Sequence, residues 1–448
     1  MNTLKGLFLY FSKKQSIRIY KNFISQIVSN SSQTILQIIF PPLMIMIYGL
    51  ENFGIWIFLT AIPSLLSILN FDLNAGARTE MSIYFNKNNK KKINEIFNNS
   101  IVITLIFVVS LVIIGFFIIT FYDFNLNILK NINSDELKII LFCIFSSFYL
   151  HIFNAIFKTG ITYWGKFYIS TYIEIYFDLF AKILILISGL ILSNLLFAFV
   201  ILFCSSVVKS IFYYYFFLHF NKSLTIFSFD LISKKQILRL LKLSTPYYLE
   251  SICNILKHSS QIIIIGIFFN AQVVGLISTT KTLFYFFPTR IWDIILKTIF
   301  YEFTKLYAEK NFNKLKNIYV NFLKLGLLFI VIFIFTSLSI GEHVYNLWLN
   351  NSYNLDFNLL ILIVLDLVFF ISATSISFVN KSINKFFQIT FFQTVINITI
   401  IIISYLLFIN QQSYYFLFLF NLIGSIIIFI YSVFFSLKLK ILKNYKKK

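Results

Sequence analysis

The chain has 448 residues, of which 58% are hydrophobic and 12% are charged, and its formal net charge is +21 at pH 7. Soluble domains are about half apolar and about one quarter charged, so this composition excludes an ordinary soluble protein. The three cysteines lie in apolar segments and the four histidines are scattered, which argues against a disulfide framework or a metal site. We therefore expect no metal, no cofactor and no enzymatic centre.

The apolar residues come in runs of about 20, the length with which a helix crosses a hydrocarbon core. These runs lack the alternation that is typical of a membrane β-barrel. The twelve predicted spans lie near residues 22–48, 53–74, 99–121, 137–158, 168–191, 194–218, 244–269, 272–300, 318–341, 356–379, 387–409 and 413–437. The sequence therefore predicts an all-α integral membrane protein with about 12 transmembrane helices and no soluble domain.

The basic residues are distributed unevenly among the predicted loops. With an even number of spans and a cytoplasmic N-terminus, the inside segments hold 29 of the 38 Lys and Arg residues, whereas the outside loops hold only Lys130 and Lys138. This asymmetry follows the positive-inside rule and predicts that both termini lie in the cytoplasm. Basic loops at a membrane surface face anionic lipid headgroups, so we expect membrane lipids and not nucleic acid as partners.

A short motif occurs twice along the chain. The sequence SKKQ is found at residues 12–15 and again at 233–236, an offset of 221 residues that also maps Arg18 onto Arg239 and Gly54 onto Gly275. The repeat predicts two halves, residues 1–230 and 231–448. With six spans each, the halves have the same orientation and are related by a pseudo-two-fold axis along the membrane normal. In such transporters the substrate binds between the repeats near the bilayer midplane.

The first span of each predicted half carries a polar stripe on one helical face. In the first span the stripe consists of Asn22, Gln26, Ser29, Asn30, Gln33 and Gln37, and in the seventh of Tyr247, Glu250, Ser251, Asn254, Lys257, His258 and Gln261. Such residues can form hydrogen bonds between helices or line a wet cavity. Ionisable residues inside a membrane normally face a bundle interior or a cavity, so the seventh-span stripe favours a cavity.

Further charges lie inside the fifth and eighth spans. In the eighth span, Asp293 is spaced to neutralise Arg290 and Lys297 along one face, whereas Lys281 needs a partner from another helix or from a bound anion. In the fifth span, Asp178 and Lys182 can pair directly, which leaves Glu174 for proton or sodium coupling. Lys209, Lys324 and Asp366 are isolated in-span charges, and the sequence offers no partner for the deeply placed Asp366.

Two segments resemble bacterial polysaccharide export proteins. Residues 48–56 read YGLENFGIW and are similar to the short connection between the first two spans of that family. Residues 69–78 read LNFDLNAGAR and resemble the segment that closes its second span, although Asn74 stands where the family has glycine. The chain thus resembles an O-antigen or capsule repeat-unit flippase, the Wzx type, within the multidrug/oligosaccharidyl-lipid/polysaccharide exporter superfamily.

The resemblance implies two six-helix bundles around a V-shaped central cavity, lined mainly by the first, second, seventh and eighth spans. It implies that an undecaprenyl-diphosphate-linked oligosaccharide is flipped from the cytoplasmic to the outer leaflet of the bacterial inner membrane by alternating access, for lipopolysaccharide O-antigen or capsule assembly. A polysaccharide polymerase and a chain-length regulator are the protein partners that it implies.

A cationic cavity suits a diphosphate, because a buried anion needs opposite charge to offset its desolvation. We expect Lys257, Lys281 and Arg290 to contact the headgroup, and Arg18 and Arg78 to receive it at the cytoplasmic mouth. The remaining substrate-binding candidates are the polar residues Asn254, His258, Gln33 and Gln37. The candidates for ion coupling are Glu250, Asp72, Asp293 and Glu174.

Two other functions compete with this interpretation. A cation-coupled multidrug exporter of the same superfamily would need a predominantly acidic cavity, whereas basic residues are at least as frequent as acidic ones within the spans here. A polysaccharide polymerase or membrane glycosyltransferase would need a sizeable outside loop or a pair of loop carboxylates. The adjacent Asp135 and Glu136 are the only such pair in an outside loop, and a solvated face explains them more simply.

Overall fold

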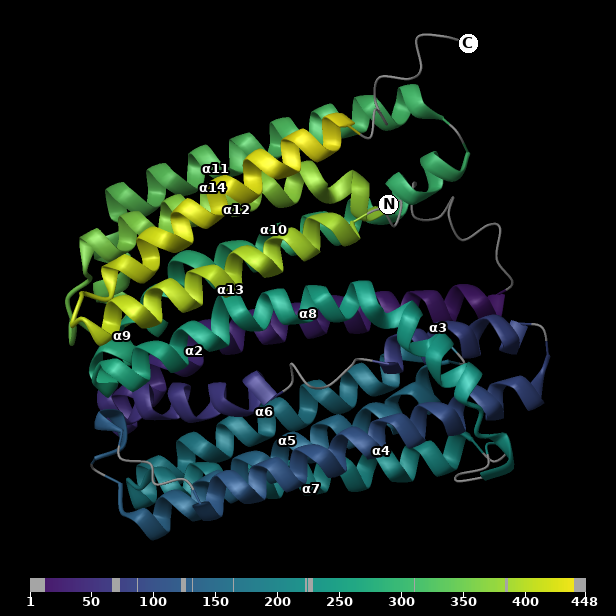
Figure 1. Ribbon diagram of the computed structural model, residues 1–448, viewed down its shortest axis with the longest axis horizontal. Coiled ribbons are helices and arrows are strands. Elements are labelled where there is room, and N and C mark those ends of the chain that lie inside the picture. Colours follow the sequence, from purple (N-terminus) through teal and green to yellow (C-terminus); the bar gives the residue numbers. More distant parts are fainter. Residues whose placement is uncertain are drawn as a thin grey trace. The chain divides into compact units, whose positions relative to one another are not determined.

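The computed structural model describes residues 13–66, 73–86, 88–121, 126–130, 132–163, 165–221, 224, 229–309, 311–382 and 386–438. Within these ranges the regular structure is helical throughout (Figure 1). The helices up to residue 220 are α2 (Lys13–Leu66), α3 (Leu73–Asn86), α4 (Lys90–Phe121), α5 (Ser134–Thr162), α6 (Phe167–Leu192) and α7 (Leu195–Phe220). The later helices are α8 (Lys234–Phe268), α9 (Ala271–Lys281), α10 (Phe287–Ala308), α11 (Phe312–Trp348), α12 (Phe357–Ser382), α13 (Phe387–Ile409) and α14 (Tyr415–Lys438).

Three short elements connect these helices. A π-helical turn, η4 (Thr282–Phe286), joins α9 to α10, and the 3-10 turns η2 (Asn127–Leu129) and η3 (Phe229–Leu231) lie in loops. Ten helices in the described part of the chain are long and apolar enough to span a membrane. One of them, α2, contains the first predicted span and the second up to Leu66, and the charged eighth span is formed by α9, η4 and α10 together. The prediction of an all-α membrane protein with about 12 spans is confirmed.

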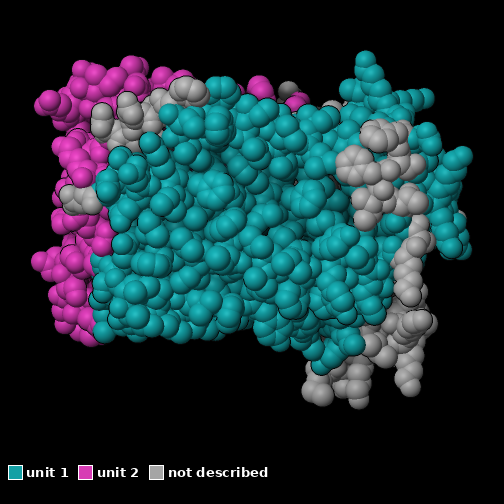
Figure 2. Space-filling model, turned by 90° about the horizontal axis from the view of Figure 1, so that it is seen from below, with its two compact units in different colours: residues 1–48, 66–124, 131–245 teal, residues 49–65, 125–130, 246–448 magenta. Residues whose placement is uncertain are grey.

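The chain packs into two compact units (Figure 2). Unit 1 comprises residues 1–48, 66–124 and 131–245, and unit 2 comprises residues 49–65, 125–130 and 246–448. Three division points lie inside helices, one of them directly before Leu66, the last residue of α2. In α2 the division follows Tyr48, where Gly49 has φ +84° and interrupts the helical backbone, and in α8 it precedes Pro246. The units are defined by packing, so the repeat boundary near residue 230 stays a prediction.

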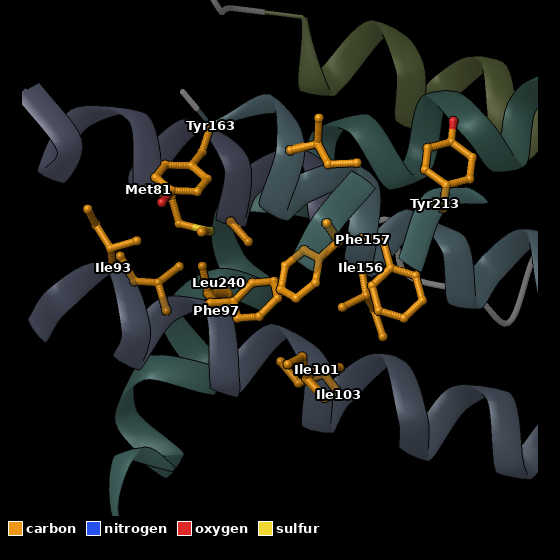
Figure 3. Close-up of a cluster of buried hydrophobic side chains, with 14 of the residues drawn as sticks. Met81, Ile93, Phe97, Ile101, Ile103, Ile156, Phe157, Tyr163, Tyr213 and Leu240 are labelled. Atoms are coloured by element: carbon orange, nitrogen blue, oxygen red, sulfur yellow. The ribbon is translucent and has the colours of Figure 1, made fainter. Parts of the chain in front are cut away.

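A buried hydrophobic cluster in unit 1 is built mainly from α3, α4, α5 and α7, with Ile173 from α6 (Figure 3). Phe97 of α4 and Phe217 of α7 stack with their ring centroids 5.5 Å apart, and Phe157 of α5 packs against Phe217 at the same distance. Gly160 permits this packing, because a Cβ there would lie 2.3 Å from the Phe217 ring. Leu240, near the start of α8, is fully buried in the same cluster.

In unit 2, α12 and α14 pack together, α13 lies against α14 and α11 against α12. Polar residues join the ends of these helices. Asp356 accepts a hydrogen bond from the Leu359 amide at 3.1 Å and caps the N-terminus of α12. The same carboxylate accepts hydrogen bonds from the hydroxyls of Tyr414, at 2.8 Å, and Tyr415 at the start of α14. Asp356 therefore fastens the adjacent ends of α12 and α14.

Candidate functional site

A polar cluster lies in the interior of unit 2, where α8, α12 and α14 supply one side chain each. The ammonium group of Lys257 is 3.3 Å from Oδ1 of Asp366 and donates a hydrogen bond to the Ser425 hydroxyl, also at 3.3 Å. The Ser425 hydroxyl in turn donates to Oδ1 of Asp366. Lys257 and Asp366 are 9% and 7% exposed, so this is an ion pair inside the helical bundle.

A second polar chain begins at Lys281, the last residue of α9. Its ammonium group donates a hydrogen bond to Oε1 of Gln261 at 3.0 Å, and Nε2 of Gln261 donates to Oδ1 of Asn421 at 2.7 Å. Lys281 is 5% exposed, and the structure describes no ion pair for it. A buried charge normally has an opposite charge beside it, because desolvation disfavours an isolated ion. Lys281 is instead held by a neutral amide.

Aromatic faces surround both ammonium groups. Lys257 Nζ lies 4.6 Å from the centroid of the Phe370 ring and 5.3 Å from that of Tyr285. Lys281 Nζ lies 5.9 Å from the ring centroids of both Phe286 and Phe418. At these distances the ring quadrupoles attract the cations and replace part of the lost hydration. The aromatic side chains therefore make two buried cations tolerable without two carboxylates.

The local backbone explains how several of these side chains reach one place. The π-helical turn η4 begins directly after Lys281 and contains Tyr285 and Phe286. A π-turn adds a residue within a helix and changes the direction of the side chains that follow, and such turns are frequent at functional sites. Pro288 stands at the start of α10, where a missing N–H is tolerated. The interruption of the α-helix in this span therefore coincides with a π-helical turn and a proline.

Two buried polar atoms in this cluster have no hydrogen-bond partner among the described residues, namely Nδ1 of His258 and the hydroxyl of Tyr285. The two rings are neighbours, with centroids 5.5 Å apart, and the His258 ring also meets Phe286 at 5.0 Å. A buried polar atom without a partner costs on the order of 1–3 kcal/mol. The cluster therefore has unused hydrogen-bonding capacity close to both lysines.

The other predicted site residues of unit 2 are more exposed than Lys257 and Lys281. Glu250, in the middle of α8, forms an ion pair with Lys381 near the end of α12, and both side chains are partly exposed. The side chains of Asn254 on α8 and of Arg290 and Asp293 on α10 are exposed. Among the predicted substrate-binding residues of unit 2, the structure thus brings Lys257, Lys281 and His258 into this cluster, whereas the side chains of Asn254 and Arg290 are exposed.

In unit 1, Gln33 and Gln37 are half-buried on α2, and the guanidinium of half-buried Arg78 lies 5.2 Å from the Phe167 ring centroid. Glu174 forms an ion pair with Lys158 at 2.6 Å and accepts a hydrogen bond from Tyr213 at 3.3 Å. Its predicted role in ion coupling stays a prediction. The predicted residues Asp72 and Arg18 are not located here, because Asp72 and the side chain of Arg18 lie outside the described part of the structure.

One predicted ion pair is wrong. Asp178 pairs with Lys209 of α7 at 2.9 Å instead of with Lys182, its neighbour one turn along α6. The ammonium group of Lys182 lies over the Phe40 ring, 5.3 Å from its centroid. Helices α6 and α7 pack side by side, so Lys209 approaches the carboxylate from the adjacent helix. Helical spacing within one span could not reveal a partner on the next.

Sequence reasoning also missed Tyr285, Ser425 and Asn421, and it found no partner for Asp366. The partners lie far apart in the chain, since Lys257 is 109 residues from Asp366 and 168 from Ser425. The unpaired in-span charges were the available signal, because a buried carboxylate and a buried lysine without local partners are expected to find each other. Choosing between Lys257 and Lys281 as the partner required the three-dimensional arrangement.

Comparison with known proteins identifies the family. Residues 19–291 match a family described as polysaccharide biosynthesis protein. A search of the curated proteins finds no match. Among solved structures, an inward-facing conformation of a multidrug resistance MATE family transporter of the MOP superfamily has a TM-score of 0.58 at 12% identity, with 93% of this chain and 95% of that chain covered.

Two further structures have the same fold. An outward-facing conformation of a multidrug resistance MATE family transporter has a TM-score of 0.56 at 14% identity, covering 94% of this chain and 97% of that one. A MOP superfamily transporter from Pyrococcus furiosus, described as having a binding pocket of reverse polarity, has a TM-score of 0.54 at 15% identity and covers 95% of both chains. These likenesses show a multi-pass transporter fold. The family match spans more than half of the chain, and this chain therefore belongs to the polysaccharide biosynthesis protein family.

Proposed function

We propose that this protein flips an undecaprenyl-diphosphate-linked oligosaccharide from the cytoplasmic to the outer leaflet by alternating access, for O-antigen or capsule assembly. The proposal rests on the family, on the transporter fold and on one observation in unit 2. Lys257 and Lys281 are both buried, yet Asp366 is the one carboxylate described in an ion pair with either of them. The excess positive charge favours an anionic substrate, and a diphosphate supplies the matching charge.

The same charge balance disfavours export of an organic cation, the competing function within the superfamily. A cationic drug near Lys257 and Lys281 would meet two ammonium groups and one carboxylate that is already paired. Repulsion between like charges in a low-dielectric interior is stronger than in water. An anionic headgroup, by contrast, would relieve the unpaired charge of Lys281.

The proposed location is the bacterial cytoplasmic membrane with both termini in the cytoplasm. The support is the distribution of Lys and Arg along the sequence, with 29 of 38 in the predicted inside segments. A lipid-linked oligosaccharide made at the cytoplasmic face would enter from that side. A polymerase and a chain-length regulator would act on the flipped unit at the outer face, and they are the proposed protein partners.

Deletion of the gene tests the proposal. We expect lipid-linked repeat units to accumulate on the cytoplasmic leaflet, and surface polysaccharide to be lost and then restored by a plasmid copy. Complementation with Lys281→Met should fail at normal protein levels, since the buried ammonium group is removed. Unchanged surface polysaccharide in the deletion strain, without accumulation of a lipid-linked intermediate, would falsify the flippase function.

A further inference from the structure

The inference rests on the proposed function and concerns Asp366, which sequence reasoning left without a role. Over Lys257, Lys281 and Asp366 the formal charge is one positive unit in excess. The neighbouring carboxylate on α8, Glu250, is already bound to Lys381. Asp366 is thus the carboxylate described in direct contact with Lys257, and no carboxylate is described in direct contact with Lys281.

Asp366 makes the contacts that a phosphate oxygen would make in the same place. A single oxygen, Oδ1, faces the Lys257 ammonium group at 3.3 Å and accepts the Ser425 hydroxyl hydrogen bond. Phosphate oxygens are acceptors of the same kind, and charged hydrogen bonds from ammonium and hydroxyl donors are typical of phosphate sites. The carboxylate and an anionic headgroup therefore compete for the Lys257 ammonium group, whereas the Ser425 hydroxyl holds Asp366 in place.

Further hydrogen-bonding groups beside this ion pair are unused. The Tyr285 hydroxyl is buried without a partner, and its ring lies 5.3 Å from Lys257 Nζ. Nδ1 of His258 is likewise unpartnered, on a ring 5.5 Å from that of Tyr285. Among the described residues, the hydrogen-bond partner of Lys281 is the neutral Gln261 alone. A headgroup with several oxygens would satisfy these groups, whereas the single carboxylate of Asp366 satisfies Lys257 and Ser425 alone.

We propose that Asp366 is an exchangeable counter-ion that holds Lys257 in the empty transporter and yields it to the diphosphate of the substrate. Lys281, Tyr285 and His258 complete the anion site. Competition by Asp366 lowers the affinity for the headgroup. A transporter needs this, because a site must bind strongly enough to load and weakly enough to release. Asp366 therefore acts as a residue that tunes affinity, without contacting the substrate itself.

The test is the binding of farnesyl diphosphate, a short prenyl diphosphate, to the full-length protein in detergent by isothermal titration calorimetry. Asp366→Asn removes the competing charge with little change in shape, and we expect binding on the order of tenfold tighter than in the wild type. Ser425→Ala weakens the hold on Asp366 without stranding a charge, and we expect a smaller gain in the same direction. Inorganic pyrophosphate shows whether the headgroup alone suffices, and uncharged farnesol measures binding of the tail.

The matched control is Asp178→Asn, which breaks another in-span Lys–Asp pair, the one with Lys209 in unit 1, and should leave farnesyl diphosphate binding unchanged. If the wild type binds farnesyl diphosphate and Asp366→Asn binds it equally or more weakly, the inference about Asp366 is overturned. The proposed function is not affected by this outcome. If Asp366→Asn does not fold, Ser425→Ala decides, and the absence of any gain there overturns the inference. If the wild type does not prefer farnesyl diphosphate to farnesol, recognition of an anionic headgroup fails, and the proposed function with it.

Discussion

Gly54 and Gly275 make reciprocal close contacts in unit 2. A Cβ atom on Gly54 would lie 1.9 Å from the carbonyl oxygen of Ala271, and a Cβ atom on Gly275 would lie 2.9 Å from that of Leu50. The offset of 221 residues maps Gly54 onto Gly275 and Leu50 onto Ala271. Each contact is therefore the image of the other, as a local two-fold relation between the second half of α2 and α9 requires.

Alanine at either glycine should destabilise the protein. Gly54→Ala places a methyl group against a backbone carbonyl that cannot rotate away, so the two helices must move apart, at a cost of about 1–3 kcal/mol. Gly275→Ala meets the Leu50 backbone at a longer distance and should cost less. The measurement is thermal unfolding of the purified protein in detergent.

Gly341→Ala is the control for these substitutions. Its Cβ would approach a side chain, the Phe284 ring, at 3.1 Å, and a ring can shift by a few tenths of an ångström. We expect a smaller fall in unfolding temperature than for Gly54→Ala. Equal falls for Gly341→Ala and Gly54→Ala would show that the α2–α9 crossing is not unusually close.

The sequence predicted the helices well because apolar run length alone determines which segments can cross a membrane. It also predicted the equivalence of Gly54 and Gly275 from the repeat. It could not predict that Gly49 would divide one long helix between two packed units, since a glycine after a tyrosine is compatible with several backbone conformations. That assignment depends on which neighbours each half of α2 meets.

Substitution of one partner of the Lys257–Asp366 pair should destabilise the protein more than substitution of both partners together. Lys257→Met leaves Asp366 buried without its cation, and we expect the free energy of unfolding to fall by about 3–5 kcal/mol. The double variant Lys257→Met, Asp366→Met removes both charges, and we expect it to recover most of this stability. The unfolding temperatures of the wild type, of Lys257→Met, of Asp366→Met and of the double variant form a double-mutant cycle.

Transport should respond differently from stability in the same variants. We expect both the single variant Lys257→Met and the double variant to fail in restoring surface polysaccharide, because each lacks an ammonium group of the proposed anion site. Recovery of transport together with stability in the double variant would assign Lys257 a purely structural role. Independent, additive effects of the two substitutions on stability would contradict the ion pair itself.

Asp356 predicts a dependence of stability on pH. Burial of its carboxyl raises the pKa, but hydrogen bonds from Tyr415, the Leu359 amide and Tyr414 outweigh burial, so the pKa of Asp356 lies below its ordinary value. The folded state therefore gains stability above the unfolded pKa of about 3.9, and this gain is lost as the pH falls through the lower, folded pKa. The unfolding temperature of the wild type should exceed that of Asp356→Asn at neutral pH and converge with it in acid.

Tyr414→Phe provides an intermediate case for this prediction. It removes one of the two tyrosine hydroxyls bound to Asp356 and keeps the carboxylate. We expect part of the stability loss at neutral pH and a convergence with the wild type over the same acid range as for Asp356→Asn, because the folded pKa of Asp356 in the wild type sets that range for both variants. A difference between the wild type and Asp356→Asn that stays constant from pH 7 to pH 3 would rule out the carboxylate as its cause.

The candidate site was predictable only in part. The polar stripe placed Lys257, His258 and Gln261 on one helix face, and the structure brings all three into the polar cluster of unit 2. Tyr285 was not predictable, because its position depends on a π-helical turn and aromatic residues are abundant throughout the chain. Hydrogen bonds between helices far apart in sequence depend on packing, which helical spacing does not encode.

The repeated SKKQ motif leads to a last prediction. In the sequence the motif served only to align the two halves, but in unit 1 its second copy contacts an acidic residue of α3. Arg239 pairs with Glu80 at 2.8 Å, and Gln236 of the motif donates a hydrogen bond to the same carboxylate at 3.3 Å. The side chain of Glu80 is 7% exposed, whereas that of Arg239 is 55% exposed. The two partners should therefore respond unequally to substitution.

Arg239→Gln leaves Glu80 as a buried carboxylate with a neutral neighbour, and we expect the larger loss of stability, on the order of 1–3 kcal/mol. Glu80→Gln leaves an arginine that solvent can hydrate, and we expect a loss below about 1 kcal/mol. Thermal unfolding of both variants and of the charge-exchanged pair Glu80→Arg, Arg239→Glu measures the asymmetry. The exchanged pair should be less stable than the wild type, because it buries the bulkier arginine in place of the glutamate. Equal losses for Arg239→Gln and Glu80→Gln would mean that the contact is hydrated and does not hold the start of α8 on unit 1.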